Sequence, residues 1–140
     1  MVPALGLLAI LGGLSMTPPY LGGAVGLELE GISSTVEIVD HVVPGLLVFA
    51  TAGVSSLLVR AGRVRQNSLV LAIALALCLL AGVWETTSHI PLALEGGRPE
   101  SPWGAVILHS LLSPLIAGVS LWLLLRALAM EPSGEQRTAR

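Results

Sequence analysis

Four long apolar runs dominate this sequence and limit what the chain can fold into. A helix of about 20 apolar residues matches the roughly 30 Å hydrocarbon core of a bilayer. We therefore expect four membrane-spanning helices, at about residues 2–23, 38–59, 69–90 and 103–126. Hydrophobic residues make up 54% of the 140 residues, and charged residues make up only 11%. A soluble domain carries roughly a quarter charged residues, so this composition predicts an integral membrane protein.

The first apolar run has a second interpretation, as a secretory signal peptide. A signal peptide carries basic residues before a short apolar core and a small-residue cleavage site after it. No Lys or Arg precedes this run, and apolar sequence continues beyond Pro18 and Pro19. The sequence therefore favours a retained span that ends near Tyr20 to Gly23.

Arginine is distributed unevenly between the predicted loops, and this distribution predicts the orientation. The loop between the second and third runs contains three arginines and no acid, and three more arginines follow the fourth run. The other two loops contain mainly glutamate among their charged residues. Because basic loops remain in the cytoplasm, we expect both termini to be cytoplasmic. The expected location is a bacterial or archaeal plasma membrane, crossed several times.

Short connections between the runs predict an all-α, up-down four-helix bundle over residues 1–130. Residues 131–140 are polar and contain Pro132 and Gly134, so this cytoplasmic tail is expected to be disordered. Helices in a bilayer associate through close contacts between small residues. The candidates for such contacts are Gly6, Gly12, Gly13, Ala50, Gly53, Ala72, Ala76, Gly82 and Gly118.

Histidines and carboxylates are concentrated at one level of the predicted bundle. Glu37 precedes His41 by four residues, which places both side chains on one helix face. Glu85 and His89 have the same spacing. At 1.5 Å per residue, these histidines and His109 fall within about two turns of the outer membrane boundary. The second and third spans run in opposite directions. His41 should therefore lie level with Glu85, and Glu37 should lie level with His89.

A proline follows each histidine within a few residues. Pro44, Pro91 and Pro114 cannot donate a hydrogen bond to the carbonyl four residues back in a helix. The carbonyls freed in this way belong to Asp40, Thr87 and Ser110. Such carbonyls are tolerated at membrane depth where they are buried in protein or line a hydrated cavity. We therefore expect a polar outer half of the bundle, with bent helices.

This combination of side chains is typical of metal sites. Neutral imidazole binds Zn, Cu, Fe or Ni, while carboxylates fill the remaining positions or fix the histidine tautomer. We therefore predict a site for Cu, Fe or Zn near the outer face, with a redox role as one option. The candidate ligands are His41, His89, His109, Glu85, Asp40 and Glu37. Haem is a weaker candidate, because two of the histidines share their helix face with a carboxylate.

Two other functions stay open at this stage. A small bundle with almost no mass outside the membrane suits an accessory or assembly subunit of a larger membrane complex, or a homo-oligomer. A transport or proton-relay component would use the same Asp, Glu and His groups as titrating sites. The formal net charge of −2 argues against a nucleic-acid partner. Nothing in the sequence predicts catalysis or names a substrate.

The polar residues also have purely structural interpretations. Glu37 and Asp40 could cap the start of the second span, because a helix N-terminus favours negative charge. His89 could contact water at the membrane interface. Glu85 and His109 are harder to explain in this way, since an ionisable group inside a span costs roughly 3 kcal/mol unless it is paired. A single hydrogen bond from Glu85 to His109 or to His41 would be enough to satisfy that need.

Overall fold

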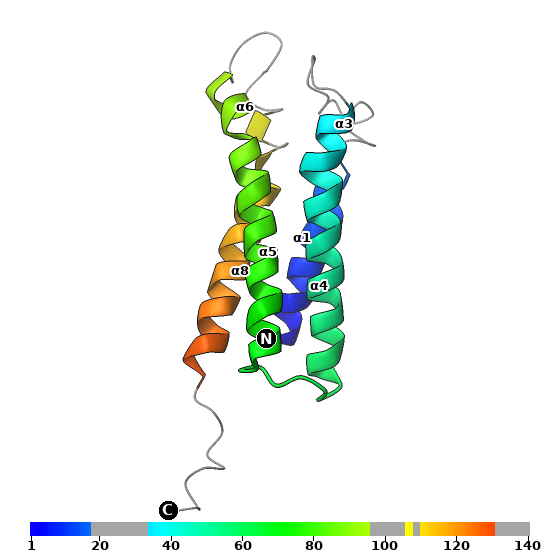
Figure 1. The fold of residues 1–140 in the computed structure, drawn as a ribbon, viewed down its shortest axis with the longest axis vertical. Coiled ribbons are helices and arrows are strands. Elements are labelled where there is room, and N and C mark those ends of the chain that lie inside the picture. The colour runs from blue at the N-terminus through cyan, green and yellow to red at the C-terminus, as the bar shows by residue number, and fades with distance from the viewer. Residues whose placement is uncertain (18–33, 96–105, 108–109, 131–140) are drawn as a thin grey trace, which may run out of the picture.

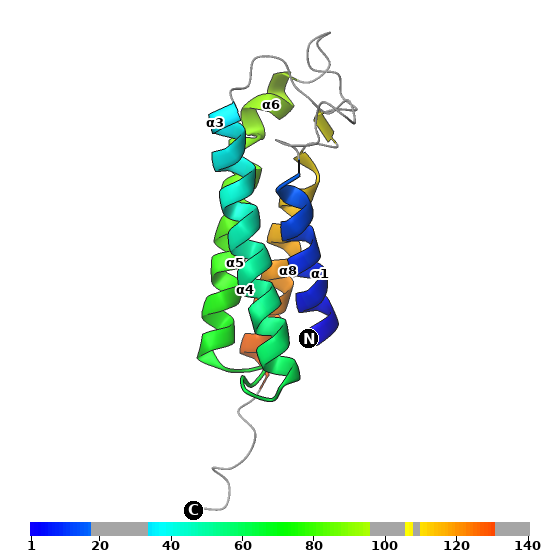
Figure 2. The ribbon, with the colours of Figure 1, turned by 90° about the vertical axis from the view of Figure 1, so that its right-hand side faces the viewer.

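The computed structural model describes residues 1–17, 34–95, 106–107 and 110–130, and every regular element among them is helical. The predicted all-α fold is therefore confirmed for this part of the chain. Four helices form a bundle in which successive helices run in opposite directions, as Figures 1 and 2 show. They are α1 (Val2–Ser15), α4 (Val43–Arg60), α5 (Leu69–Ser88) and α8 (Leu112–Ala129).

Shorter helical segments extend two of these helices. Before α4 come α3 (Ser34–Glu37) and the π-helical segment η1 (Ile38–Val42), and after α5 comes α6 (Ile90–Glu95). All three lie at one end of the bundle (Figure 1). The loop between α4 and α5 lies at the opposite end, together with the start of α1.

Three helical stretches are long and apolar enough to cross a membrane: Ile38–Arg60, Leu69–Ser88 and Leu112–Ala129. Large apolar side chains cover their outer faces, and Leu57, for example, is 67% exposed. Helix α1 is equally apolar but has only 14 residues. The predicted first span at 2–23 continues into residues outside the described part of the chain. The predicted tail at 131–140 lies entirely outside it. The four-span topology and its orientation therefore stay predictions.

The third predicted span is divided at its C-terminal end. The sequence predicts one helix from 69 to about 90, but α5 ends at Ser88 and a separate helix, α6, starts at Ile90. Pro91 is the second residue of α6. Proline fits the first turn of a helix, where its missing N–H has no partner to lose. The proline therefore begins a new segment instead of bending a continuous helix.

The fourth predicted span extends further at its C-terminal end. The sequence predicts a helix from about 103 to 126, and the long helix α8 runs from Leu112 to Ala129. Residues 106–107 and 110 are also helical, and because 103–105 and 108–109 lie outside the described part of the chain, the predicted start stays a prediction. Pro114 is the third residue of α8. The Ser110 carbonyl, which Pro114 cannot satisfy, accepts a hydrogen bond from the Ser113 hydroxyl at 3.2 Å. The Ser113 hydroxyl thus replaces the backbone N–H that Pro114 lacks.

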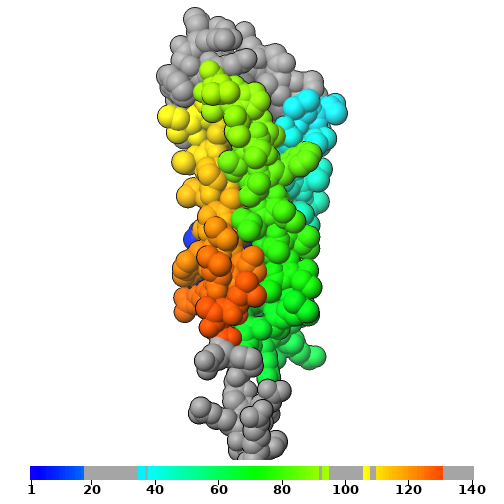
Figure 3. Space-filling view, turned by 60° about the vertical axis from the view of Figure 1, so that its left-hand side comes forward, coloured from blue at the N-terminus to red at the C-terminus, as the bar shows by residue number. Residues whose placement is uncertain are grey.

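Glycines allow the closest helix contacts in the bundle. Helix α1 packs mainly against α4, and α5 packs mainly against α8 along its length (Figure 3). A Cβ atom added to Gly12 on α1 would lie 2.7 Å from the backbone nitrogen of Phe49 on α4. A Cβ atom added to Gly82 on α5 would lie 2.7 Å from the backbone nitrogen of Ala117 on α8. Both helix pairs therefore require glycine at the point of contact.

The predicted small-residue contacts are only partly correct. Gly12 and Gly82 lie at helix contacts, as expected. A Cβ atom added to Gly6 or Gly118 would meet nothing within 4 Å, so these two glycines are not used for close packing between the described helices. Gly45, which the prediction missed, faces Gly12: a Cβ atom there would lie 2.8 Å from the Gly12 carbonyl oxygen.

Candidate functional site

The end of the bundle that carries η1 and α6 also holds His41, Glu85 and His89, and is called the histidine end below. His41 belongs to the π-helical segment Ile38–Val42, directly before α4. In a π-helix the amides pair with carbonyls five residues back instead of four, and single π turns occur frequently at functional sites. This geometry is compatible with Pro44, which cannot donate to the carbonyl of Asp40. It turns His41 into the bundle, where only 1% of the residue is exposed.

Helix α5 supplies the other two side chains. Glu85 lies in its last turn and is 2% exposed, and His89 is the residue that ends the helix and is 7% exposed. The four-residue spacing places both on the face that meets α4 and η1. The backbone N–H of His89 bonds to the carbonyls of Thr86 and Thr87. The end of α5 is therefore closed by its own residues while the imidazole turns inward.

Three contacts join these side chains into one network. His41 Nδ1 lies 3.0 Å from Glu85 Oε1. His41 Nε2 lies 3.2 Å from His89 Nε2, and the two rings meet edge to face with their centroids 4.7 Å apart. His89 Nδ1 contacts the backbone carbonyl oxygen of Glu85. Each of the four imidazole nitrogens thus faces a polar atom, and the network ties α5 to η1.

A serine hydroxyl adds to this network. The Ser88 hydroxyl donates to the Glu85 carbonyl at 2.9 Å, and its oxygen lies 3.2 Å from His89 Nδ1. The imidazole nitrogens and the Glu85 carboxylate therefore all face polar partners, as deeply buried polar groups require.

The structure brings together three of the six predicted ligands, and it contains the predicted contact between His41 and Glu85. Asp40 is partly exposed in η1, directly before His41 in the sequence. The side chain of Glu37 and the whole of His109 lie outside what the structure describes. The predicted level of Glu37 with His89 therefore stays a prediction.

The donor atoms fit part of a metal site. Within the described residues, no group of three or more His, Cys, Asp or Glu side chains is placed to hold a metal ion. Two nitrogen ligands of a tetrahedral zinc ion, each at about 2.0–2.1 Å, lie about 3.3 Å apart. The two Nε2 atoms of His41 and His89 are 3.2 Å apart. Their spacing therefore suits two positions of such an ion, and further ligands would have to complete it.

The sequence did not reveal the direct contact between the two imidazoles. It placed Glu37 level with His89 and Glu85 level with His41. The structure in addition places His89 against His41 and against the Glu85 carbonyl. A π-helical segment before Pro44 was the missing information, because it sets the direction of His41. The proline itself was the available signal.

Comparisons with protein families, curated proteins and solved structures found no match for this chain. Any function assigned to it therefore rests on the chemistry of its own residues.

Proposed function

We propose that this chain is a membrane protein that binds a transition-metal ion at its histidine end, with the Nε2 atoms of His41 and His89 as ligands. One observation carries the proposal. Both Nδ1 atoms face oxygen acceptors, the carboxylate and the carbonyl of Glu85, which leaves the two Nε2 atoms directed at each other. Metal-binding histidines almost always donate their other ring N–H to a carboxylate or a carbonyl. Glu85 would then position both imidazoles without binding the ion.

The chemistry of the ligands narrows the choice of metal. Imidazole nitrogen suits copper, iron and zinc better than magnesium or calcium, which prefer oxygen. Copper or iron would supply one-electron chemistry when bound, whereas zinc would not. His109, Asp40 and Glu37 are the sequence-predicted candidates for the remaining positions, together with water. The described residues supply only the two imidazoles and the group that orients them.

The apolar surface supports a location in a bilayer. Three helices are long and apolar enough to span it, and exposed Leu, Ile, Val and Trp side chains cover the bundle between its two ends. The positive-inside rule places the arginine-rich loop between α4 and α5 in the cytoplasm. Under this proposal both termini are cytoplasmic and the histidine network lies near the outer face.

A proton-relay function would use the same network, because its imidazole and carboxylate groups can titrate. Along α4 and α5, the next described buried polar side chain is Ser55, and the layer between it and the network is apolar. Its buried side chains there include Val48, Ala52, Leu71, Leu75 and Cys78. A proton would have to pass this apolar layer within one chain, so the arrangement favours metal binding over relay.

Titration of the metal-stripped protein with Cu(I), Cu(II), Fe(II) and Zn(II) tests the proposal. At least one of these ions should bind with near-unit stoichiometry. His41→Ala and His89→Ala should each weaken binding at least tenfold, because each removes a ligand. Glu85→Gln should weaken it by about 10- to 100-fold, because the orienting partner is altered.

Thr87→Ala is the matched control for these variants. Thr87 lies on the same helical turn, is exposed, and bonds through its hydroxyl only to the Trp84 carbonyl of its own turn. It should bind metal as the wild type does. The proposal is wrong if no ion binds to the wild type, or if the folded His41→Ala and His89→Ala variants retain wild-type affinity. Circular dichroism and gel filtration identify the folded variants.

A further inference from the structure

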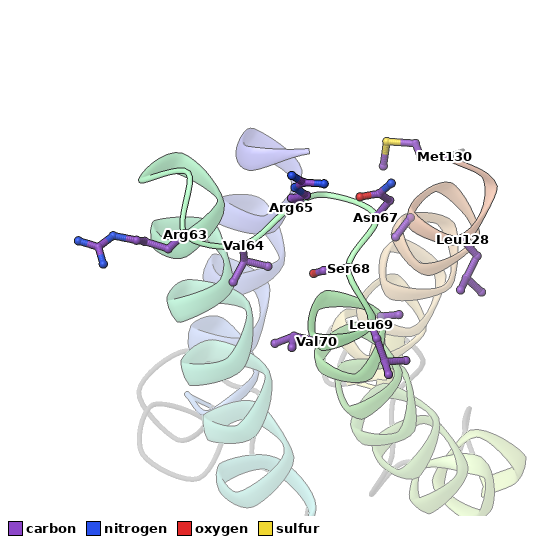
Figure 4. Close-up of a pocket in the computed structure, with 11 residues that line it drawn as sticks. Arg63, Val64, Arg65, Asn67, Ser68, Leu69, Val70, Leu128 and Met130 are labelled. Atoms are coloured by element: carbon purple, nitrogen blue, oxygen red, sulfur yellow. The ribbon is translucent and has the colours of Figure 1, made fainter. Parts of the chain in front are cut away.

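A pocket lies at the opposite end of the bundle from the histidine network. It has a volume of about 700 Å³ and lies between the α4–α5 loop and the adjoining ends of α5 and α8 (Figure 4). Helix α4 is terminated just before this loop by Gly62, whose φ of 67° favours glycine. The loop then passes over the start of α5 and closes one side of the pocket.

The lining of this pocket has a polar rim and an apolar floor. Arg65, Asn67 and Ser68 belong to the rim, and Figure 4 shows Arg65 and Asn67 on the loop beyond Leu69 and Val70. The apolar residues Val64, on the same loop, and Met130, after α8, complete this side of the lining. Arg63 also lines the pocket, but its side chain points away from α5 and α8 in that view. The floor is formed by the apolar residues Leu69, Val70, Ala72, Ala127 and Leu128. Leu69 is 75% exposed and Leu128 is 66% exposed, so this floor is open to the surroundings.

Electrostatics at this end favour an anion. The described arginines Arg60, Arg63, Arg65 and Arg126 all lie at this end of the bundle, and every described Asp and Glu lies on the elements of the histidine end. The start of α5 adds the partial positive charge of a helix N-terminus. Ser68 already caps that terminus by accepting a hydrogen bond from the Leu71 amide. Arg65 is therefore the principal charge at the rim.

An exposed tryptophan lies near this end of the bundle. The Arg126 guanidinium lies 5.5 Å from the centroid of the Trp122 ring, and Trp122 lies about two turns before the end of α8. Trp122 is 51% exposed. Exposed tryptophans with a neighbouring arginine are typical of the boundary between acyl chains and headgroups. The pair therefore supports placing this end of the bundle at that boundary.

We infer that this pocket binds an anionic phospholipid, with its phosphate at Arg65 and Asn67 and an acyl chain along Leu69, Val70 and Leu128. A free phosphate ion would need only the rim. The exposed apolar floor directly beneath it matches a lipid, because the two parts of the lining correspond to the two parts of that molecule. The inference depends on the proposed membrane location and not on the proposed metal site.

Native mass spectrometry of the full-length protein, released from detergent with added lipid, tests this inference. Palmitoyl-oleoyl phosphatidylglycerol should remain bound, whereas the corresponding phosphatidylcholine should not. Arg65→Gln should reduce retention of phosphatidylglycerol at least tenfold. Arg60→Gln removes the same charge at the same end but outside the pocket lining, and it should change retention less than twofold.

Three results would overturn the lipid assignment. Equal losses in Arg60→Gln and Arg65→Gln would show a general charge effect without a site. Competition by soluble glycerol phosphate at the concentration of the lipid would identify a free-phosphate site. Retention that is undetectable in the full-length protein and appears only after removal of residues 131–140 would show that the chain's own tail, and not a lipid, fills the pocket; this deletion leaves the net charge unchanged, since it removes two Glu and two Arg. The metal titration is independent of all three results.

Discussion

Glu85→Ala should lower the free energy of unfolding by about 3 kcal/mol, because it leaves buried polar groups of the network without a partner. Glu85 is 2% exposed, and its carboxylate is the described partner of His41 Nδ1 at 3.0 Å. Alanine would remove that partner and leave His41 Nδ1 buried without it. Unfolding of the detergent-solubilised protein by sodium dodecyl sulfate, followed by circular dichroism, measures the change.

Two variants separate the loss of this interaction from a general effect of mutation. Glu85→Gln retains an oxygen acceptor for His41 and should cost about 1–2 kcal/mol, less than the alanine variant. Thr87→Ala, on the exposed side of the same turn, should stay within about 0.5 kcal/mol of the wild type. If Glu85→Ala were as stable as Thr87→Ala, the network would not stabilise the fold.

A double-mutant cycle then measures the coupling between Glu85 and His41. Because the two side chains belong to one network, His41→Ala and Glu85→Ala should be non-additive by about 0.5–3 kcal/mol. Additive losses would show that each residue acts through other contacts. The cycle therefore tests the contact between Glu85 and His41 itself, independently of any metal.

Gly82→Ala and Gly118→Ala should change stability in opposite directions. The Cβ atom at position 82 would lie 2.7 Å from a backbone nitrogen of α8, so the two helices would have to move apart. Overpacking of this kind costs about 1–3 kcal/mol. At position 118 the Cβ atom meets nothing within 4 Å, and alanine is favoured over glycine in a helix by about 1 kcal/mol.

The same unfolding assay distinguishes these two glycine variants. Gly12→Ala provides a second test, because its Cβ atom would also lie 2.7 Å from a backbone nitrogen, here of Phe49. It should resemble Gly82→Ala. If Gly12→Ala and Gly82→Ala were stabilised as Gly118→Ala is expected to be, the close α1–α4 and α5–α8 contacts would be absent from the detergent-solubilised protein.

The helical elements could be predicted from the sequence where an apolar run is uninterrupted. The runs placed the start of α5 at Leu69 and the end of α4 near Arg60, as the structure has them. They do not show the break between α5 and α6 at His89, just before Pro91. Hydropathy reports burial in lipid, and it does not report where a backbone hydrogen bond is lost.

Only the position of the site along the bundle axis could be predicted from the sequence. Counting residues from the helix ends placed His41 level with Glu85, because rise per residue is constant in a regular helix. The direction in which the His41 side chain points could not be counted in the same way. The π-helical turn at Ile38–Val42 changes the rotation of this residue about the helix axis. The contact between the two Nε2 atoms depends on that rotation. For the same reason Gly45, just after the π-helical segment, was not recognised as a packing residue.

X-ray absorption spectroscopy of the metal-loaded protein tests the central proposal most directly. Under this account, the spectrum of the bound ion shows at least two imidazole ligands at about 2.0–2.1 Å. The number of imidazoles falls by one in His41→Ala and by one in His89→Ala, and it is unchanged in Thr87→Ala. An ion coordinated by oxygen alone, or an imidazole count that neither histidine variant changes, would contradict the assignment of His41 and His89 as ligands.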